Sequence, residues 1–399
     1  KSLIKHNLMR AAMTLALIMT CATAWAETVE TYYIDENGTR HDVTATVVTT
    51  YMDNLGTDDE TTWYVVNENV FLYDGSNNQT HLHGNVNLII ADGCELKPAC
   101  GSNGSEDGFR GSGNLTLYGQ TAGTGTLSCG QEGFMNITGD FTVCSGMVSV
   151  SGYRYNAIRV ANFTMRGGSV SIENNTNNDC GIRATGTVNI YDGSVEAEGT
   201  NGIEADIVNI YGGSVTARCN GRNAPGSNYG HAIKCSSTFN FYGGNVTAQS
   251  DLNLLEDQTR YGIYANGINL SWTSTADWIY NTKDVNSNNV ICYFVGSGGM
   301  NIAPYKPFTD GTTTYTGTLT DEQVEALADK TLQPAVPTFA ETGNGTPEHP
   351  YTIWNAIGWS QFCDALQDAT YNHFSGKTVK LGADISIRQS AGSAGHEFM

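Results

Sequence analysis

One phrase that recurs through the middle of the chain limits the available folds more than any other feature. Five copies lie between about residues 141 and 272, and they read FTVCSGMVSV, FTMRGGSVSI, VNIYDGSVEA, VNIYGGSVTA and FNFYGGNVTA. The last glycine of each copy returns after 22, 25, 20 and 31 residues, at Gly146, Gly168, Gly193, Gly213 and Gly244. A repeat of this length cannot bury a hydrophobic face alone, so successive repeats must stack on one another.

A second, shorter phrase accompanies each copy of the first. It reads AIRV, GIRA, GIEA, AIKC and GIYA, starting at Ala157, Gly181, Gly202, Ala232 and Gly262. Each repeat therefore contains two or three short strands.

Alternation within the phrases assigns side chains to opposite faces of a strand, because successive side chains point to opposite sides. In Val188-Asn189-Ile190 the branched residues point one way and the asparagine the other. The shorter phrases contribute a second inward stack, made of Ile158, Ile182, Ile203, Ile233 and Ile263. Stacked repeats then pair each strand with its counterparts and enclose a continuous apolar interior. The glycines mark the corners, where the chain needs positive φ or close approach.

We therefore expect an all-β fold whose main part is a parallel β-helix, a solenoid that is right-handed as such coils usually are. The alternative is an antiparallel sandwich, which also has short strands separated by turn residues. A sandwich does not explain why equivalent residues return after a whole repeat, so the parallel coil is the favoured interpretation.

The ends of the chain suggest a wider organisation. Lys1, Lys5 and Arg10 precede an apolar run, and Ala24-Trp25-Ala26 forms a cleavage site, which together are typical of a secretory signal peptide. The competing interpretation, a membrane anchor, needs about 20 apolar residues, more than this run has. The predicted organisation is a signal peptide at 1–26, an N-terminal cap at 27–60, the parallel β-helix at 61–310, a short helix and linker at 311–342 and the start of a second β-helix-like domain at 343–399.

Two elements near the end of the chain are predicted in more detail. Thr320 or Asp321 is expected to cap a short helix that buries Val324, Leu327 and Ala328. Within 343–399 we expect a strand at Tyr351–Ile353, a helix at Asn355–Leu366 and strands within Thr378–Ile387. Because the sequence stops at Met399 without closing a core, we interpret the chain as a fragment.

Charge and cysteine content narrow the function classes. The chain has 40 Asp and Glu against 20 Lys and Arg, a formal charge of −20, and no Lys/Arg-rich run after the first ten residues. These features argue against a nucleic-acid partner. Nine cysteines follow residue 26 and none forms a CxxC pair, which argues against a zinc site. Cys235 replaces an alanine or valine of other repeats, so we expect it to be a small buried hydrophobe. No segment after the signal peptide is apolar enough to span a membrane.

Two outward columns are candidate ligand-binding sites. The first consists of Arg159, Arg183, Glu204, Lys234 and Tyr264, which are expected to lie rung on rung about 4.8 Å apart. It is either a polar, partly cationic stripe that binds uronic acids or a structural ladder of exposed ion pairs. The second column consists of the corner tyrosines Tyr191, Tyr211 and Tyr242, with Tyr118 at a similar place in an earlier repeat. It either stacks on sugar rings or stacks on itself.

Calcium and catalysis are weaker expectations. Asp192, Glu196, Glu198, Glu204 and Asp206 lie close in the sequence, which makes Ca²⁺ possible, but they match no EF-hand or nonapeptide calcium pattern. β-Helices also include pectin lyases and polygalacturonases, whose chemistry needs clustered carboxylates or a calcium site. The paired aspartates of polygalacturonases have no counterpart on the predicted strands. The Gly230-His231 pair only partly resembles that family's Gly-His segment, so we expect no enzyme.

The NIYGGSVTA and GIxA phrases, at Asn189–Ala197, Asn209–Ala217 and Gly202–Ala205, resemble those of bacterial extracytoplasmic right-handed β-helix proteins. That group includes carbohydrate-binding β-helix modules and adhesin-like surface proteins. The segment Gly343–Ile387 is similar to the helix-capped entry into GLUG-type bacterial surface repeats. The resemblance implies a secreted or cell-surface module that binds polysaccharide or host glycans. The alternatives are a β-helix polysaccharide lyase or glycoside hydrolase, and a passive structural stalk of a larger surface protein.

Overall fold

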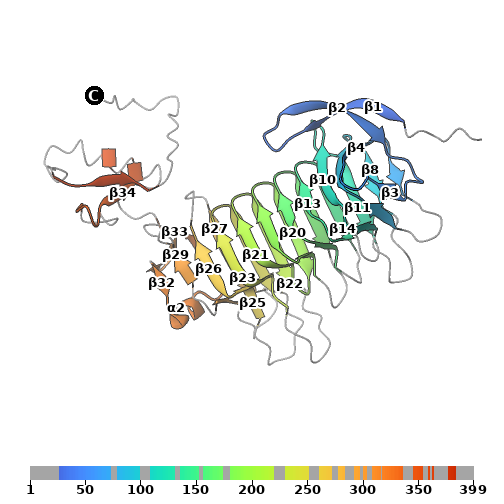
Figure 1. Ribbon diagram of the computed structural model, residues 1–399. Helices are drawn as coiled ribbons and strands as arrows, with labels where there is room; N and C mark the ends of the chain where they lie inside the picture. Colours follow the sequence, from blue (N-terminus) through green and yellow to red (C-terminus); the bar gives the residue numbers. More distant parts are fainter. Residues whose placement is uncertain are drawn as a thin grey trace, which may run out of the picture.

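A computed structural model of the chain describes residues 27–72, 79–98, 108–130, 135–151, 156–173, 180–219, 230–250, 260–271, 277–283, 292–296, 300–302, 308–315, 317–335, 345–353, 358–359, 362–363 and 376–382. The predicted signal peptide at 1–26 lies outside these ranges. The described chain is nearly all β, and most of its strands belong to two long sheets (Figure 1). No helix in the described ranges is long and apolar enough to cross a membrane.

Each repeat contributes three strands, which we call its first, second and third strand. The first strands are β3 (Asn54–Leu55), β6 (Thr80–Leu82), β9 (Phe109–Gly111), β12 (Met135–Ile137), β15 (Ile158–Val160), β18 (Ile182–Ala184), the beginnings of β21 (Ile203–Ile210) and β23 (Ile233–Phe241), β25 (Arg260–Ala265) and β28 (Cys292–Gly296). The second strands are β4 (Thr61–Val66), β7 (Asn85–Ile90), β10 (Asn114–Gly119), β13 (Phe141–Val143), β16 (Phe163–Met165), β19 (Thr187–Ile190), the ends of β21 and β23, β26 (Gly267–Leu270) and β29 (Met300–Ile302).

The third strands form the second long sheet. They are β5 (Val70–Phe71), β8 (Glu95–Lys97), β11 (Thr126–Gly130), β14 (Met147–Ser151), β17 (Ser169–Glu173), β20 (Ser194–Gly199), β22 (Ser214–Cys219), β24 (Asn245–Ser250) and β27 (Trp278–Lys283). Every strand of these three sets pairs in parallel with its counterpart in the next repeat, as β14 does with β17 and β17 with β20. We call this arrangement the strand stack. Parallel pairing at whole-repeat separation rules out the antiparallel sandwich.

The interior of the strand stack is the apolar core that the alternation predicts. Ile182 pairs with Ile203, and Ile203 pairs with Ile233, so equivalent side chains lie one above another. All five isoleucines of this column are fully buried, and so are Val188 and Ile190. Asn189, between them, is only half-buried. The early segments belong to the same stack, since β4 pairs with β7 and β7 with β10. The alternation therefore predicts both faces correctly.

The corner glycines keep successive repeats close together. Gly213 has a φ of +75°, and a Cβ atom built on it would lie 2.6 Å from the backbone oxygen of Gly193 in the previous repeat. A side chain at this position therefore meets both an unfavourable backbone conformation and a fixed neighbour. The other four glycines of the recurring phrase also have positive φ.

Buried cysteines fill core positions. Cys235 is fully buried, as its place in the repeat predicts, and burial raises the pKa of its thiol to about 12. Cys219 is also fully buried, and Cys129 is disulfide-bonded. A thiol that stays protonated at neutral pH is a poor nucleophile, so Cys235 has a packing role.

An N-terminal hairpin covers the outer face of the first repeats. Its strands, β1 (Thr28–Ile34) and β2 (Arg40–Val47), pair antiparallel, and β2 continues in parallel with β4. A small second core lies beneath it, in which Ala45 and Val47 pack with Val65 and Ile89 and with the rings of Tyr33, Trp63 and Tyr118. The hairpin crosses the N-terminal end of the strand stack (Figure 1). The predicted cap region also supplies β3, which pairs with β6 inside the stack.

Antiparallel strands and one short helix follow the strand stack at its other end. β33 (Thr331–Pro334) pairs with β27 and with β30 (Phe308–Thr309), β30 pairs with β31 (Thr314–Tyr315), and β32 (Thr318–Leu319) pairs with β29. Helix α2 (Asp321–Glu325) begins at the N-cap Thr320, which forms a capping box with Gln323. Val324 lies on the helix and is buried, as predicted. The helix ends at Glu325, earlier than predicted, so the buried Leu327 and the half-buried Ala328 lie in the turn that follows it.

The last described strands form a separate two-stranded sheet. β34 (Tyr351–Ile353) matches the predicted strand and pairs in parallel with β35 (Val379–Leu381). Of the helix predicted at 355–366, the structure describes only 358–359 and 362–363, which are helical. The rest of that prediction lies outside the described residues.

Replacing corner glycines separates backbone strain from close packing. Gly123 has a φ of +64° with open space around it, so Gly123→Ala should cost about 1–2 kcal/mol in unfolding free energy. Gly213→Ala carries the same strain and also the collision with Gly193, which adds about 1–3 kcal/mol. Urea unfolding of both variants measures the difference. Equal losses of stability would contradict the close stacking of repeats at this corner.

Candidate functional site

The five residues of the first predicted column lie on successive rungs of the strand stack. Arg159 pairs with Arg183, Arg183 with Glu204, Glu204 with Lys234, and Lys234 with Tyr264. Their strands hold them there because the isoleucine before each one is fixed in the core. The structure therefore brings this predicted column together in the predicted order.

The column extends further toward the N-terminus than the repeats indicate. Arg159 pairs with Asn136, Asn136 with Arg110, Arg110 with His81, and His81 with Asn54. Sequence analysis missed these residues because β9 and β12 carry FRG and MNI in place of the GIxA phrase. The one available signal was alternation, since Phe109, Met135 and Ile137 are buried on either side of the outward residues. We call the whole set, from Asn54 to Tyr264, the first-strand column.

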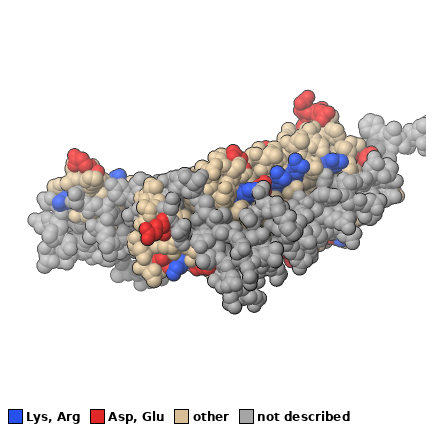
Figure 2. Space-filling view, turned by 90° about the horizontal axis from the view of Figure 1, so that it is seen from below, with Lys and Arg blue, Asp and Glu red and all other residues tan. Residues whose placement is uncertain are grey.

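Positive charge dominates the first-strand column. It carries four permanent cations, Arg110, Arg159, Arg183 and Lys234, and one carboxylate, Glu204. Glu204 lies between two of the cations, 3.7 Å from Arg183 Nη2 and 3.7 Å from Lys234 Nζ. Arg159 is exposed and belongs to none of the ion pairs among the described residues. Figure 2 shows Lys and Arg side chains in a row along one face of the molecule. This arrangement attracts anions on a chain whose net charge is −20.

Two buried polar side chains, Asn201 and Cys180, hold the Glu204 carboxylate in place. Asn201 donates a hydrogen bond to Glu204 Oε2 at 2.5 Å, and Cys180 Sγ lies 3.4 Å from the same oxygen. Burial, and then the charge of Glu204, raises the pKa of the Cys180 thiol to about 12. Cys180 is therefore a protonated donor and not an activated nucleophile. Glu204 is held in place by these groups, so its carboxylate is a permanent feature of the column.

His231, from the Gly-His pair, belongs to the packing of the same region. Its backbone N–H donates to Asn201 Oδ1 at 2.8 Å, and its ring stacks on Tyr264 with 4.7 Å between centroids and 9° between planes. The residue is buried. These contacts give His231 a structural role at the end of the cationic column.

The corner tyrosines form a ladder whose ring faces meet one another. The centroids of Tyr191 and Tyr211 lie 4.6 Å apart with planes at 4°, and those of Tyr211 and Tyr242 lie 4.8 Å apart at 8°. The guanidinium of Arg166 lies 5.2 Å from the Tyr191 ring centroid, on the next rung. The inner faces are therefore occupied, which favours the self-stacked interpretation over stacking on sugar rings. The ring edges and hydroxyl groups remain toward solvent, since Tyr191 is 42% and Tyr211 39% exposed.

Tyr118 begins the same column but has different surroundings. Its ring contacts Tyr33 and Trp63 beneath the N-terminal hairpin, with centroids 4.4 Å and 5.4 Å away. Cys144 and Arg166 occupy the two rungs between Tyr118 and the exposed tyrosines. Tyr118 is therefore part of the covered surface and is separated from the ladder of Tyr191, Tyr211 and Tyr242.

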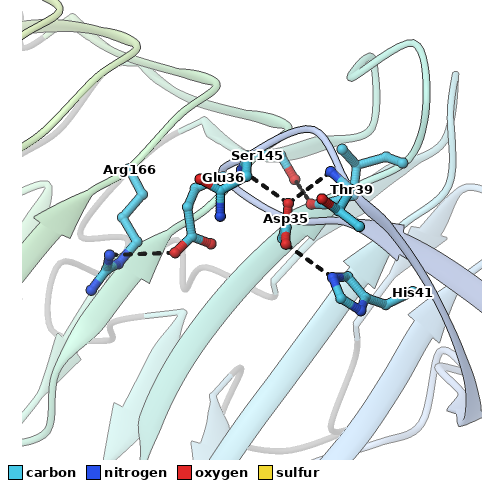
Figure 3. A network of polar contacts seen from close by, with 8 residues as sticks. Asp35, Glu36, Thr39, His41, Ser145 and Arg166 are labelled. Atoms are coloured by element: carbon cyan, nitrogen blue, oxygen red, sulfur yellow. Dashed lines mark hydrogen bonds and ion pairs between the residues drawn. The ribbon is translucent and has the colours of Figure 1, made fainter.

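The tip of the hairpin is anchored beside that ladder (Figure 3). Asp35 accepts backbone hydrogen bonds from Asn37 and Thr39, and its Oδ2 lies 2.9 Å from His41 Nε2. The hydrogen bond with His41, followed by that from Thr39, lowers the pKa of Asp35 below its ordinary value. Two contacts join this tip to the strand stack: Glu36 lies 3.4 Å from Arg166 Nη1, and Ser145 Oγ donates to the Ile34 carbonyl at 2.8 Å. Arg166 thus links the hairpin to the first tyrosine.

The five acids considered for calcium lie on different parts of the strand stack. Glu196, on the third strands, forms an ion pair with Arg218. Glu198 lies opposite Arg218 in the register of β20 and β22. Asp206, near the first strands, accepts a hydrogen bond from Ser236 Oγ at 2.7 Å. Asp192 accepts from its neighbouring backbone N–H at the corner. No group of three or more acidic, histidine or cysteine side chains within the described ranges is arranged to hold a metal ion.

Comparisons with known proteins add no functional assignment. No family model, no curated protein and no solved structure matches the chain. The first-strand column and the tyrosine ladder are therefore the features of this chain that bear on its function.

The tyrosine ladder predicts a specific alkaline sensitivity. Partial burial, and then the neighbouring Tyr191 and Tyr242, raises the pKa of Tyr211 above its ordinary value of 10. The folded chain therefore holds this proton more tightly than the unfolded chain. The resulting stabilisation is complete below about pH 10 and is lost as the pH rises through the raised pKa.

Tyr211→Phe keeps the ring and removes the ionising hydroxyl group. We expect it to reduce the loss of unfolding free energy between about pH 8 and pH 11, measured by urea unfolding. Tyr51→Phe is the control, because the Tyr51 side chain is 80% exposed. An equal effect of the two substitutions would show that ring stacking does not control the ionisation of Tyr211.

Proposed function

We propose that the strand stack is a right-handed parallel β-helix and that the chain is a secreted or cell-surface module that binds acidic polysaccharide without cleaving it. Three-strand repeats paired in parallel with the next repeat support the coil. The resemblance of the repeat phrases to bacterial extracytoplasmic β-helix proteins, including carbohydrate-binding and adhesin-like members, supports the location and the ligand class. A host glycan that carries carboxylates belongs to the same chemical class.

The observation that carries this proposal is the charge of the first-strand column. Four cations against one carboxylate stand in register on a chain whose net charge is −20. Rungs are spaced by about 4.8 Å, so a linear polyanion that lies along the stack meets Arg159 and Arg183 on adjacent rungs. Arg110 and Lys234 lie two rungs further on either side, beyond Asn136 and Glu204. Arginine forms two parallel hydrogen bonds with a carboxylate, which suits Arg159 and Arg183 to uronic acids. Arg159 is exposed and outside the described ion pairs, so it is the residue of the column most available to a carboxylate of the ligand.

Binding without turnover is favoured over a lyase or a glycoside hydrolase. Glu204 is paired with Arg183 and Lys234, and Cys180 is kept protonated by burial. Neither group is prepared for acid, base or nucleophilic work, which needs a free carboxylate or a thiolate. A passive stalk has the same scaffold but predicts no affinity for any glycan. Release of reducing ends or unsaturated products from pectin, xylan or alginate would support the enzyme instead.

Removing the leading cations tests the proposal. We expect Arg159→Ala with Arg183→Ala to weaken binding to polygalacturonate and alginate about tenfold or more, because each lost charge-assisted hydrogen bond contributes about 1.5–3 kcal/mol. Affinity electrophoresis with the polymer in the gel measures the change. The control is Arg40→Ala with Lys97→Ala, which removes the same charge outside the column and should retain most of the binding.

Glu204→Gln distinguishes a binding column from a ladder of ion pairs. The substitution removes the only carboxylate of the column and releases Arg183 and Lys234, so we expect tighter binding to the acidic polymers. It should also make that binding more sensitive to salt, since exposed charges are screened. A ladder that serves stability alone predicts a small loss of unfolding free energy and no change in binding. Unchanged binding in both this variant and the double alanine variant would refute the proposal.

A further inference from the structure

The second strands carry a face without formal charge. Over the four repeats of β19, β21, β23 and β26 it comprises residues 187–191, 207–211, 238–242 and 267–271, and none of these is acidic or basic. Three outward columns cross it. The middle one is Asn189, Asn209, Asn240 and Asn269, and the tyrosine ladder lies two residues further along each strand. We call this surface the amide face.

The four asparagines form one continuous hydrogen-bonded ladder. Asn209 Nδ2 donates to Asn189 Oδ1 at 2.9 Å, Asn240 to Asn209 at 2.8 Å, and Asn269 to Asn240 at 2.7 Å. All three bonds run in the same direction, so the amide dipoles are aligned and polarise one another. The carboxamides are consequently fixed before any ligand arrives.

Asn189 and Asn209 retain hydrogen-bonding capacity after the ladder is made. A carboxamide has two N–H donors and an oxygen with two acceptor lone pairs, and the ladder uses one donor and one lone pair of each inner asparagine. Both side chains are half-buried, so their remaining donors and acceptors adjoin solvent. The Nδ2 group of Asn240 also lies 3.5 Å from Thr238 Oγ1. The result is two adjacent rungs with unused amide donors and acceptors, about 4.8 Å apart.

The strand stack does not need asparagine at this position. The preceding rungs of the same column carry Thr142 and Thr164, and Thr164 pairs in register with Asn189. Their strands keep the same parallel pairing as the asparagine rungs. Strand pairing alone therefore does not require the asparagines. Their ladder adds to the stability of the sheet, and the unused groups of Asn189 and Asn209 are available to a ligand.

We propose that the amide face is a second binding site, which takes a neutral polysaccharide chain lying along the stack. Sugar hydroxyl groups donate and accept, as the remaining amide groups do, and the hydroxyl groups of Tyr191, Tyr211 and Tyr242 add polar contacts at one edge. No cation on this face attracts a carboxylate, and the net charge of −20 repels a polyanion. Fixed amides lose little conformational freedom on binding, which favours affinity. Its residues differ from those of the first-strand column, although β21 and β23 carry parts of both.

A threonine replacement tests the site with a residue that the column already accepts. Asn189→Thr, Asn209→Thr and Asn240→Thr together should lower affinity for neutral polymers at least tenfold. Affinity electrophoresis with galactomannan, arabinoxylan and hydroxyethylcellulose is the measurement. The urea unfolding midpoint is measured in parallel, and Asn209→Thr alone, with an expected smaller loss, replaces the triple variant if that variant does not fold.

Two controls separate this proposal from the binding of acidic polymers. Arg159→Ala with Arg183→Ala should leave neutral-polymer affinity unchanged, and the asparagine variants should leave polygalacturonate affinity unchanged. Loss of both affinities in the same variant would instead indicate one shared site. The amide face is not a binding site if the wild-type chain binds none of the three neutral polymers, or if a folded threonine variant binds them as the wild type does.

Discussion

Parallel pairing of each strand with its counterpart one repeat away is the constraint on which the rest of the structure depends. It places like residues above like residues, so one residue type that packs well is repeated along the interior. Ile182, Ile203 and Ile233 form a core column by this means. The same pairing acts on the outside, where it turns side chains that are far apart in sequence into the first-strand column, the tyrosine ladder and the amide face. Core and surface chemistry are therefore set by one geometric rule.

That rule also explains how much was predictable from the sequence. The inward isoleucines, the corner glycines and the order of Arg159, Arg183, Glu204, Lys234 and Tyr264 follow from the repeat alone. The N-terminal hairpin does not, because β1 packs on β4 and β10 through contacts of the Tyr33 ring with Trp63 and Tyr118 that no period encodes. Arg110 and Asn136 were missed where the GIxA phrase is absent. The cluster of Cys180, Asn201 and Glu204 joins neighbouring repeats through side chains that the alternation does not orient.

The position of a side chain in a ladder does not by itself determine whether that side chain can bind a ligand. Sequence reasoning places Tyr191, Tyr211 and Tyr242 together, but whether a ring faces its neighbour or a ligand depends on its side-chain torsions. In the structure the ring faces meet, so the aromatic column stabilises the corner and offers mainly its edges. The asparagines differ, because the ladder leaves part of the Asn189 and Asn209 amides unused. Two outward columns of similar regularity therefore have different capacities for a ligand.

The unequal repeat intervals have a consequence for how such a chain varies. Intervals of 20 to 31 residues coexist with parallel pairing of β18, β21 and β23, although the register of β21 and β23 shifts by one residue after Ala205. Most of the extra residues of the longest interval therefore lie between a third strand and the following first strand, where length can change while the paired core side chains stay in place. Substitution elsewhere is confined by the rung above and the rung below. Related chains can then differ in length at the edge between third and first strands while the rest of the strand stack stays the same.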